Sequence, residues 1–502
     1  MLEETILTNK KTIRMEQKKT TNAFVVVIAI IAATGGLLFG YDSGVISGAL
    51  LYIKQDPVLL ANGQEVMPER IQEWIVSIVL VGATIGAISS GRLTDMYGRK
   101  KIIIFTAILN AVGTLLSALA PTVIILLIAR GLVGLAIGVA SYTVPLYISE
   151  MSPAKVRGTL VTLNQLAITV GILASYLVNI GFSDLPAGWS AWGISEGWRW
   201  MLMIGFFPAL ILGIGMIFLP ETPRWLMSAN YENKAHKVLS KIGELNPSRV
   251  VGEIKESLAK EERAGWSELL AKWVRPALII GIGMAVLMQI TGINTVIYYS
   301  PTILQKAGFV AEGDAILAAL PIGIVNVVFT IVALFLIDKW GRKPLLYLGL
   351  TGMAISLFVL GFSFLFHQAV GDALKWVSFG SMIIYIPFFA LTLGPVGYLI
   401  MSEVFPTRVR GLGMSVALFF NWVANFVVAN TFLSLASALT AEGNQIAITG
   451  ETGPNPGGSF LVYAIIAILG ILFVYRMVPE TKGHSLEEIE QHFQEGKPPR
   501  EL

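Results

Sequence analysis

Twelve long apolar segments, separated by shorter polar stretches, run through the whole sequence. A helix needs roughly 20 consecutive apolar residues to cross the core of a bilayer, and each segment is close to that length or longer. The pattern therefore predicts an all-α membrane protein with twelve spanning helices. The expected spans are 23–48, 72–92, 101–119, 122–147, 159–182, 200–219, 276–300, 315–337, 344–366, 374–402, 411–437 and 458–478.

The composition supports this prediction. Hydrophobic residues make up 54% of the chain and charged residues only 14%, whereas soluble domains carry about 25% charged residues. The sequence has no cysteine, which excludes disulfides and thiolate metal sites. Its histidines (His236, His367, His484 and His492) are too scattered for ligand pairs. We therefore expect no metal and no cofactor, and the net charge of +3 gives no indication of a nucleic-acid partner.

Lysine and arginine are unevenly distributed among the polar stretches. Five lie between residues 10 and 19, four in 92–101 and three in 339–343, whereas 55–71 contains only Arg70. Basic loops stay on the cytoplasmic side, so both termini should be cytoplasmic, which requires an even number of spans. The first apolar run is too long for a signal-peptide core and is expected to remain as the first span. We expect a multi-pass cell-membrane protein.

The chain repeats itself at three places in unchanged order. Residues 95–100 (Asp-Met-Tyr-Gly-Arg-Lys) recur as 338–343, the Ser-Glu motif of 149–158 recurs at 402–411, and Pro-Glu-Thr at 220–222 recurs at 479–481. These matches indicate a duplicated unit of six spans, one of the recurring plans of transporters. Convergence of basic loops would not reproduce the accompanying Gly, Pro and acidic residues.

The duplication divides the chain into five parts. We expect a cytoplasmic tail (1–22), a six-helix bundle (23–220), a cytoplasmic helical linker (221–275), a second bundle (276–480) and a C-terminal tail (481–502). Within the linker, 231–242 and 251–264 have the pattern of short amphipathic helices. The tail from residue 484 onward is polar and is expected to be exposed and partly disordered.

Acidic residues accompany arginines at the expected cytoplasmic ends of both halves. Because glutamate and a guanidinium pair well, we expect ion pairs between the two halves that hold the cytoplasmic side shut. Topology signals and helix capping are the alternative, and they do not explain why the acids recur. The gate residues are Arg92, Asp95, Arg99, Glu150, Arg157, Glu221 and Arg224 in the first half, and Asp338, Arg342, Glu403, Arg410 and Glu480 in the second.

Two charged residues are expected inside the membrane. Asp42 follows the uncharged run of the first span, and Arg130 lies within the fourth. Such charges are costly in a bilayer and usually mark a pathway for a proton, an ion or a polar solute. Burial raises the proton affinity of a carboxylate and a nearby guanidinium lowers it. We therefore expect Asp42 to accept a proton and Arg130 to tune it; a static buried ion pair is the alternative.

These motifs resemble the sugar porter family of the major facilitator superfamily. The resemblance rests on Gly40-Tyr41-Asp42, on the two Gly-Arg-Lys turns and on the two Pro-Glu-Thr motifs, and it extends over residues 23–490. Bacterial proton-coupled symporters of the xylose, glucose and inositol type are the most similar members. The resemblance implies two six-helix bundles, a central sugar site and alternating access.

The same resemblance implies the sugar-binding positions. Amides on them would offer hydrogen-bond donors and acceptors to hydroxyl groups, and aromatic rings would lie on the apolar side of a sugar; bonds between helices are the alternative use of such amides. Breaks at Gly292, Pro301 and Gly394-Pro395 are expected to interrupt spans seven and ten near the site. The positions are Phe39, Gln165, Gln289, Asn294, Tyr298, Tyr299, Asn326, Tyr398, Asn421 and Trp422.

The chain departs from the pattern of the xylose symporter at several positions. Met288 and Ile172 replace glutamines, Tyr398 replaces a tryptophan, and Gly205 stands where that symporter has a further acid. The sugar therefore stays open between hexose, pentose and inositol, and a facilitative uniporter remains an alternative to a symporter.

The sequence thus predicts a transporter that imports a sugar or polyol with a proton by alternating access. A sugar sensor without transport is a weaker alternative, because the C-terminal tail is short. No nucleophile–histidine–acid set, phosphate loop or channel filter is present, so neither an enzyme nor a channel is expected. The expected partners are the sugar or polyol, the proton and the lipid bilayer, with a bacterial source and a functional monomer.

Overall fold

The structure is a computed structural model that describes residues 23–502 except 61–63, 154–155, 184–196, 260–264 and 449–450. Twelve helical segments of the described chain are long and apolar enough to span a membrane, which confirms the expected number. They are α2 (Ala23–Ile53), α3 (Glu69–Tyr97), α4 (Arg99–Ala118), α5 (Val123–Glu150), α6 (Arg157–Gly181), α7–α8 (Gly197–Phe218), α13–α14 (Arg275–Lys306), α15 (Glu312–Trp340), α16 (Arg342–Leu365), α18–α19 (Ala373–Val404), α20 (Arg410–Ala429) and α22 (Gly457–Met477).

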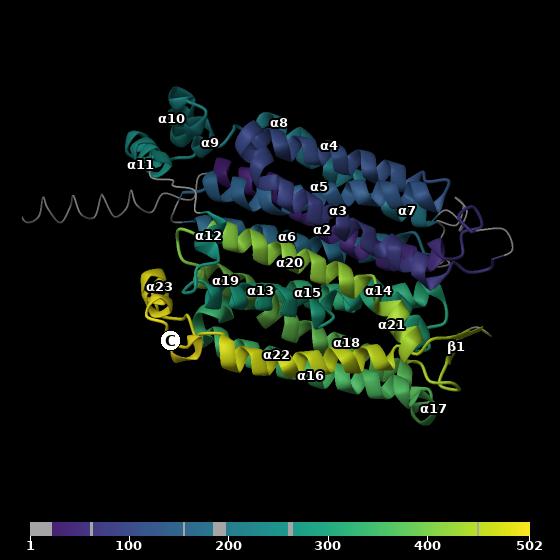
Figure 1. Cartoon of the computed structure of the whole chain (residues 1–502). Coiled ribbons are helices and arrows are strands. Elements are labelled where there is room, and N and C mark those ends of the chain that lie inside the picture. The colour runs from purple at the N-terminus through teal and green to yellow at the C-terminus, as the bar shows by residue number, and fades with distance from the viewer. Residues whose placement is uncertain (1–22, 61–63, 154–155, 184–196, 260–264, 449–450) are drawn as a thin grey trace, which may run out of the picture.

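The helices form two groups that follow the sequence halves (Figure 1). In the first half, α2 packs on α6, α3 on α5, and α4 on α5 and α8. A Cβ atom at Gly134 would lie 2.0 Å from the carbonyl oxygen of Val79, so the backbones of α3 and α5 touch. Small residues permit such close crossings between membrane helices. In the second half, α16 packs on α22 and α18, and α13 on α20.

The two halves meet chiefly along three helix pairs. These pairs are α2 with α14, α3 with α20, and α6 with α15. In each pair, one helix belongs to the first half and the other to the second. The facing surfaces of these six helices therefore border the region between the halves. Any site shared by the two halves must be built from these surfaces.

Two spans are interrupted where the sequence predicts breaks, at Gly292 and beside Gly394, but the break expected at Pro301 is absent because α14 continues through this residue. Span seven divides into α13 (Arg275–Ile290) and α14 (Ile293–Lys306), joined by Gly292 with φ +91°. Only glycine adopts that conformation readily. Span ten contains α18 (Ala373–Phe388), a π-helical turn η3 (Phe389–Leu393) and α19 (Gly394–Val404). Pro395 lacks the N–H that a regular helix would require there.

The linker forms the amphipathic helices that the pattern predicts. They are α10 (Glu232–Lys241) and α11 (Pro247–Ala259), flanked by the short α9 (Pro223–Ser228) and α12 (Trp266–Leu269). Apolar residues of α9 to α11 join a core cluster with α2, α4 and α5 of the first half. We call the end of the molecule that carries α9–α12 and α23 the linker end (Figure 1).

The opposite end carries a short hairpin of β1 (Ile446–Ile448) and β2 (Glu451–Gly453), together with α17 (His367–Val370). We call it the hairpin end (Figure 1). Here the predicted extent of span eleven is wrong. Helix α20 ends at Ala429, and a separate helix α21 (Phe432–Leu439) follows. At the break, the backbone carbonyl oxygen of Asn430 accepts from Arg70 and its side-chain oxygen accepts from the Ser77 hydroxyl, both at 2.9 Å, so both groups bond to α3 rather than within the helix.

The C-terminal tail is more ordered than the sequence analysis predicts. Residues Leu486–Gln494 form helix α23, which begins with a capping box between Ser485 and Glu488. Ile489 and Phe493, four residues apart, are each 1% exposed, and α23 packs against α19. Burial of this apolar pair outweighs the polar composition of the segment.

Candidate functional site

The two charges inside the first bundle are partners. Asp42 lies on α2 and Arg130 on α5, with Nη1 to Oδ1 at 3.3 Å and Nη2 to Oδ2 at 3.5 Å. The Arg130 Nε–H also donates to the carbonyl oxygen of Ile75 on α3 at 2.7 Å. Arg130 is 1% exposed, whereas the Asp42 side chain retains 14% exposure. The guanidinium is therefore fixed by α3 while the carboxylate remains accessible.

Asp42 and Arg130 border two small cavities. One lies inside the first bundle and is also lined by Asn110, Thr114, Ser117 and Gly205. The other lies between the bundles and is also lined by Phe39, Ser43, Tyr298 and Trp422. Each has room for roughly one water molecule. The carboxylate thus stands between the interior of one bundle and the space shared by both.

Aromatic residues close the shared cavity from both sides. The rings of Phe39 on α2 and Trp422 on α20 lie 5.5 Å apart between centroids, at 52°. Tyr298 of α14 is 3% exposed and lines the same cavity. The structure therefore brings together Asp42, Phe39, Tyr298 and Trp422 from three helices and both halves.

Three of the predicted amides form one hydrogen-bonded chain. The Asn294 amide donates to the Gln289 side-chain oxygen at 2.6 Å, and the Gln289 amide donates to the Asn421 oxygen at 3.2 Å. The Asn421 amide in turn donates to the carbonyl oxygen of Ala285 at 2.8 Å. The break at Gly292 makes this possible because it lets Asn294 of α14 turn back to Gln289 of α13.

Asn425 is a further polar residue of this region that the sequence analysis misses. It lies one turn after Asn421 on α20, and its amide donates to the Tyr298 hydroxyl at 3.4 Å. Its side-chain oxygen is buried and has no hydrogen-bond partner among the described residues. The four-residue spacing from Asn421 is the sequence signal that could have found it.

The remaining predicted sugar positions lie outside this group. Gln165 on α6 is half-buried, Asn326 on α15 is 6% exposed and Tyr398 on α19 is 38% exposed. None of the three has a side-chain hydrogen bond within the described part of the chain. Tyr299 is fully buried, its ring lies 5.1 Å from that of Phe432, and its hydroxyl donates to the carbonyl oxygen of Ala429. That hydroxyl therefore serves the packing of α14 on α20.

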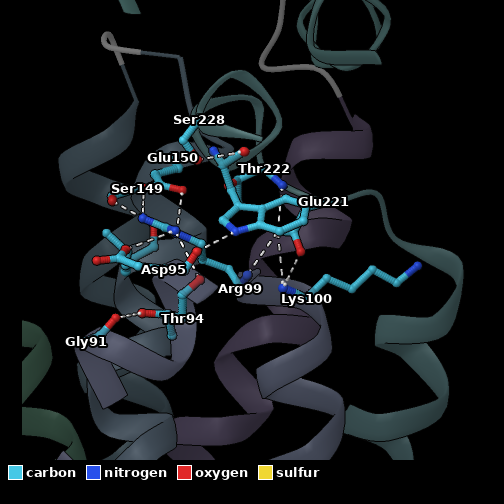
Figure 2. Close-up of polar contacts among 12 residues, drawn as sticks. Gly91, Thr94, Asp95, Arg99, Lys100, Ser149, Glu150, Glu221, Thr222 and Ser228 are labelled. Carbon is cyan, nitrogen blue, oxygen red and sulfur yellow. Dashed lines mark hydrogen bonds and ion pairs between the residues drawn. The ribbon is translucent and has the colours of Figure 1, made fainter. Parts of the chain in front are cut away.

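At the linker end, charged residues of the first half form a compact cluster (Figure 2). The Arg99 guanidinium lies 3.2 Å from the Glu150 carboxylate and 3.3 Å from that of Asp95. Glu221 accepts hydrogen bonds from the backbone N–H groups of Arg99 and Lys100, both at 3.1 Å. Glu221 therefore caps the start of α4. Burial is the main effect on this carboxyl and raises the pKa of Glu221.

The second half repeats this arrangement. Arg342 pairs with Glu403 at 2.9 Å, and Glu480 accepts from the backbone N–H groups of Arg342 and Lys343 at 3.0 and 2.9 Å. Thr481 also donates to Glu403. The two clusters match motif by motif, as the duplicated sequence predicts.

The expectation that these pairs join the two halves does not hold in this structure. Each of the two clusters lies within one bundle, because the glutamate that reaches each arginine comes from its own half. The Arg410 guanidinium bonds to the carbonyl oxygen of Phe405 and the hydroxyl of Thr407 rather than to a glutamate. Arg92 and Arg157 are exposed and Arg224 is half-buried, and the Asp338 side chain lies outside the described residues.

Comparison with known proteins places the chain in a family. A profile for the family described as sugar (and other) transporter matches residues 28–493. The D-xylose transporter of Levilactobacillus brevis is 40% identical over 476 residues, 94% of this chain and 96% of that protein. The galactose-proton symporter of Escherichia coli K12 is 36% identical over 491 residues, 97% of this chain and 98% of that protein.

A solved structure has the same fold. The partially occluded inward-open conformation of the xylose transporter XylE from E. coli superposes with a TM-score of 0.77 at 31% identity, over 92% of this chain and 100% of that one. Together with the twelve apolar helices, these matches establish that the chain is a multi-pass membrane protein and belongs to the sugar porter family of the major facilitator superfamily.

Proposed function

We propose that this protein imports a sugar or polyol together with a proton, by exposing a site between its two bundles alternately to either side of the membrane. The observation that carries the proposal is the cavity between the bundles. Asp42 borders it together with Phe39, Tyr298 and Trp422. A carboxylate that can titrate is thus placed beside the aromatic surfaces on which a sugar would lie.

The chemistry of the surrounding side chains supports a neutral, hydroxyl-rich substrate. The chain of Asn294, Gln289 and Asn421 offers donors and acceptors without charge, and the buried oxygen of Asn425 has no hydrogen-bond partner among the described residues. Sugars and cyclic polyols carry many hydroxyls that both donate and accept. The similar proteins named above include a D-xylose transporter and a galactose-proton symporter, in line with this class.

The ion pair supplies the coupling in this proposal. When Asp42 accepts a proton, its attraction to Arg130 weakens, while Arg130 stays bound to the carbonyl oxygen of Ile75 on α3. Protonation therefore frees α2 from α5 and changes which conformation is favoured. A change of roughly 3 kcal/mol in this balance would change the ratio of two conformations by more than a hundredfold.

The proposed orientation places the linker end in the cytoplasm and the hairpin end outside. Contacts between bundles such as Ser77 to Asn430 lie at the hairpin end, whereas both charged clusters at the linker end stay within their own bundles. In this orientation the closed hairpin end faces outward, so the proposal treats the structure as an inward-facing conformation in the cell membrane. Function as a monomer is part of the same proposal.

Transport by membrane vesicles tests the coupling. The Asp42→Asn variant should lose accumulation of labelled sugar against its gradient under an inward proton gradient, because its amide cannot take up a proton. It should keep sugar counterflow, which requires no net proton movement. The exposed Glu65→Asn variant serves as control and should accumulate like the parent chain. Full accumulation by Asp42→Asn would contradict the assignment.

A facilitative uniporter is the second candidate, and Gly205 is the observation that favours it. This residue borders the cavity inside the first bundle at the position where the xylose symporter carries a second acid. If the parent chain equilibrates labelled sugar but never accumulates it, uniport is correct. A competition panel of glucose, xylose and inositol in proteoliposomes, run with and without a pH gradient, identifies the substrate in the same experiment.

A further inference from the structure

Glu73 lies on α3 in the first half, yet its side chain bonds to the second half. Its Oε1 accepts the backbone N–H of Ser434 at 2.7 Å, and its Oε2 accepts the Ser434 hydroxyl at 2.5 Å. Arg70, one turn earlier on α3, lies 3.2 Å from Oε2. The Glu73 side chain is completely buried. A carboxylate of the first half is therefore neutralised and bonded at the interface between halves.

Ser434 occupies the first turn of α21, where backbone N–H groups have no partner within the helix. A side chain just before a helix usually satisfies such a group. Thr431, the residue before α21, makes no capping bond, and its hydroxyl instead donates to the carbonyl oxygen of Val427. Glu73 thus caps α21 from the other bundle, in the position that the helix dipole favours for a negative charge.

Neighbouring contacts join the same two surfaces. Arg70 donates to the carbonyl oxygen of Asn430 at 2.9 Å, and the Ser77 hydroxyl donates to the side-chain oxygen of Asn430 at 2.9 Å. Ser437, on the next turn of α21, donates to Glu69. Contacts of α3 therefore reach from Asn430 to Ser437 and close the hairpin end along its length.

Separating the halves at the hairpin end would break these bonds together. A buried carboxylate that loses its donors is strongly disfavoured unless water replaces them. The first turn of α21 would lose its cap in the same movement. The bonds to Glu73 consequently favour the conformation in which the hairpin end is shut.

We propose that Glu73 is a gating residue of the transport cycle, which holds the hairpin end closed by capping α21 across the interface. This inference rests on the proposed function, since a gate has a role only if the site faces both sides in turn. It adds to the cycle a residue that neither binds sugar nor carries the coupled proton.

The absence of native cysteine makes a direct test possible. Ser43 lines the cavity between the bundles, so Ser43→Cys reports access to that cavity. Labelling of this reporter by a membrane-impermeant maleimide, added to the outside of intact cells, measures how often the hairpin end opens. Adding Glu73→Gln should raise the labelling rate about tenfold or more, because hydrogen bonds to a charged group are each worth a factor of that order. The exposed Glu65→Gln should leave the rate unchanged.

A second variant keeps the test decisive if Glu73→Gln folds poorly. Ser434→Ala retains the charge of Glu73 and its bond to the backbone but removes the hydroxyl donor, so it should raise labelling by a smaller factor. Labelling of both variants at the parent rate would overturn the gating role. Sugar counterflow by the parent chain, without the Ser43→Cys reporter, is measured separately. Its absence would refute the proposed function, whereas the labelling result would still decide the role of Glu73.

Discussion

Gln289 shows at the residue scale how few side chains hold the site together. It accepts from Asn294 and donates to Asn421, and thereby connects α13, α14 and α20. At 7% exposure it is nearly buried, so water cannot readily replace a lost partner. Its removal would leave the buried Asn421 side-chain oxygen without this donor, at a cost of about 1–3 kcal/mol, and would release the half-buried Asn294 amide.

Gln289→Leu should therefore weaken sugar binding by about tenfold or more. The half-saturation concentration for counterflow measures this, and thermal unfolding in detergent shows the accompanying loss of stability. Met288→Leu, at the neighbouring buried position, conserves volume and makes a suitable control because such exchanges cost little. An unchanged half-saturation concentration for Gln289→Leu would show that the amide chain lies outside the substrate site.

The carboxyl group of Glu221 should make the stability of the folded protein depend on pH. Burial raises its pKa in the folded protein, and hydrogen bonds from Thr222, Lys100 and Arg99 oppose this effect. A raised folded pKa favours the folded state most at pH values below the unfolded pKa. That contribution is lost as the pH rises through the folded pKa.

The melting temperature of the parent chain, taken relative to Glu221→Gln, should therefore fall as the pH rises from about 4 to neutrality. The glutamine does not titrate, so its own curve removes the contributions of all other groups. Glu232→Gln, on the exposed face of α10, should follow the parent curve throughout. If the melting temperature of the parent chain relative to Glu221→Gln instead rises with pH, the hydrogen bonds at the start of α4 outweigh burial in their effect on the Glu221 carboxyl.

At the scale of helices, the break in span seven gives α14 a direction independent of α13. Gly292 has φ +91°, and a Cβ atom there would lie 2.7 Å from the ring of Tyr463. The backbone conformation and the packing both require glycine at this position. Regular helix across the break would also carry Asn294 away from Gln289.

Gly292→Ala should destabilise the protein by about 1–3 kcal/mol from backbone strain alone. It should also slow counterflow, because the amide chain depends on the break. Gly380 on α18 provides a contrast, since a Cβ atom there meets nothing within 4 Å. Gly380→Ala should leave the protein as stable or slightly more stable. Equal melting temperatures for the two variants would contradict the role assigned to the break.

The sequence predicts the helices well because apolar length alone determines a membrane span. It places α21 within span eleven, since nothing in the apolar pattern marks Asn430 as a point where bonds turn outward. It also misses the order of α23, which depends on burial of Ile489 and Phe493 against α19. Contacts between distant segments decide these cases, and hydropathy does not encode them.

In the candidate site, too, the contacts between distant segments are the part that the sequence does not predict. The pairing of Asp42 with Arg130 follows from the cost of two charges in a membrane, so it could be predicted. Glu73 could not, because its partner Ser434 is 361 residues away and its position at the start of span two resembles that of an ordinary loop acid. Only some of the expected gate residues form the two ion-pair clusters, and each pair lies within one half rather than between the halves. The sequence shows the repetition of the motifs but not which half supplies each glutamate.

At the scale of the whole molecule, the two charged clusters at the linker end are separate units. Arg99 with Glu150 and Arg342 with Glu403 are equivalent pairs in different bundles, and no residue belongs to both clusters. Pairs without shared partners contribute independently to stability.

The losses of stability in Glu150→Gln and Glu403→Gln should therefore add in the double variant to within about 0.5 kcal/mol. Chemical unfolding of the single and double variants in detergent measures this. The exposed Glu253→Gln in the linker is also combined with each variant. These double variants show how closely the losses of stability add for positions that are unrelated. Strong coupling between positions 150 and 403 would indicate that the clusters meet across the halves in a populated conformation.

The contact of backbone on backbone between α3 and α5 has a mechanical consequence. Where the two backbones are in contact, no side chain lies between them that could change its rotamer and let one helix slide past the other. We therefore expect α3 and α5 to move together as a rigid unit. The second half instead contains the glycine joint of span seven and the wide turn of span ten, which bend at low cost. In the proposed cycle, bending of the second half should therefore concentrate at these two interruptions, while α3 and α5 move together.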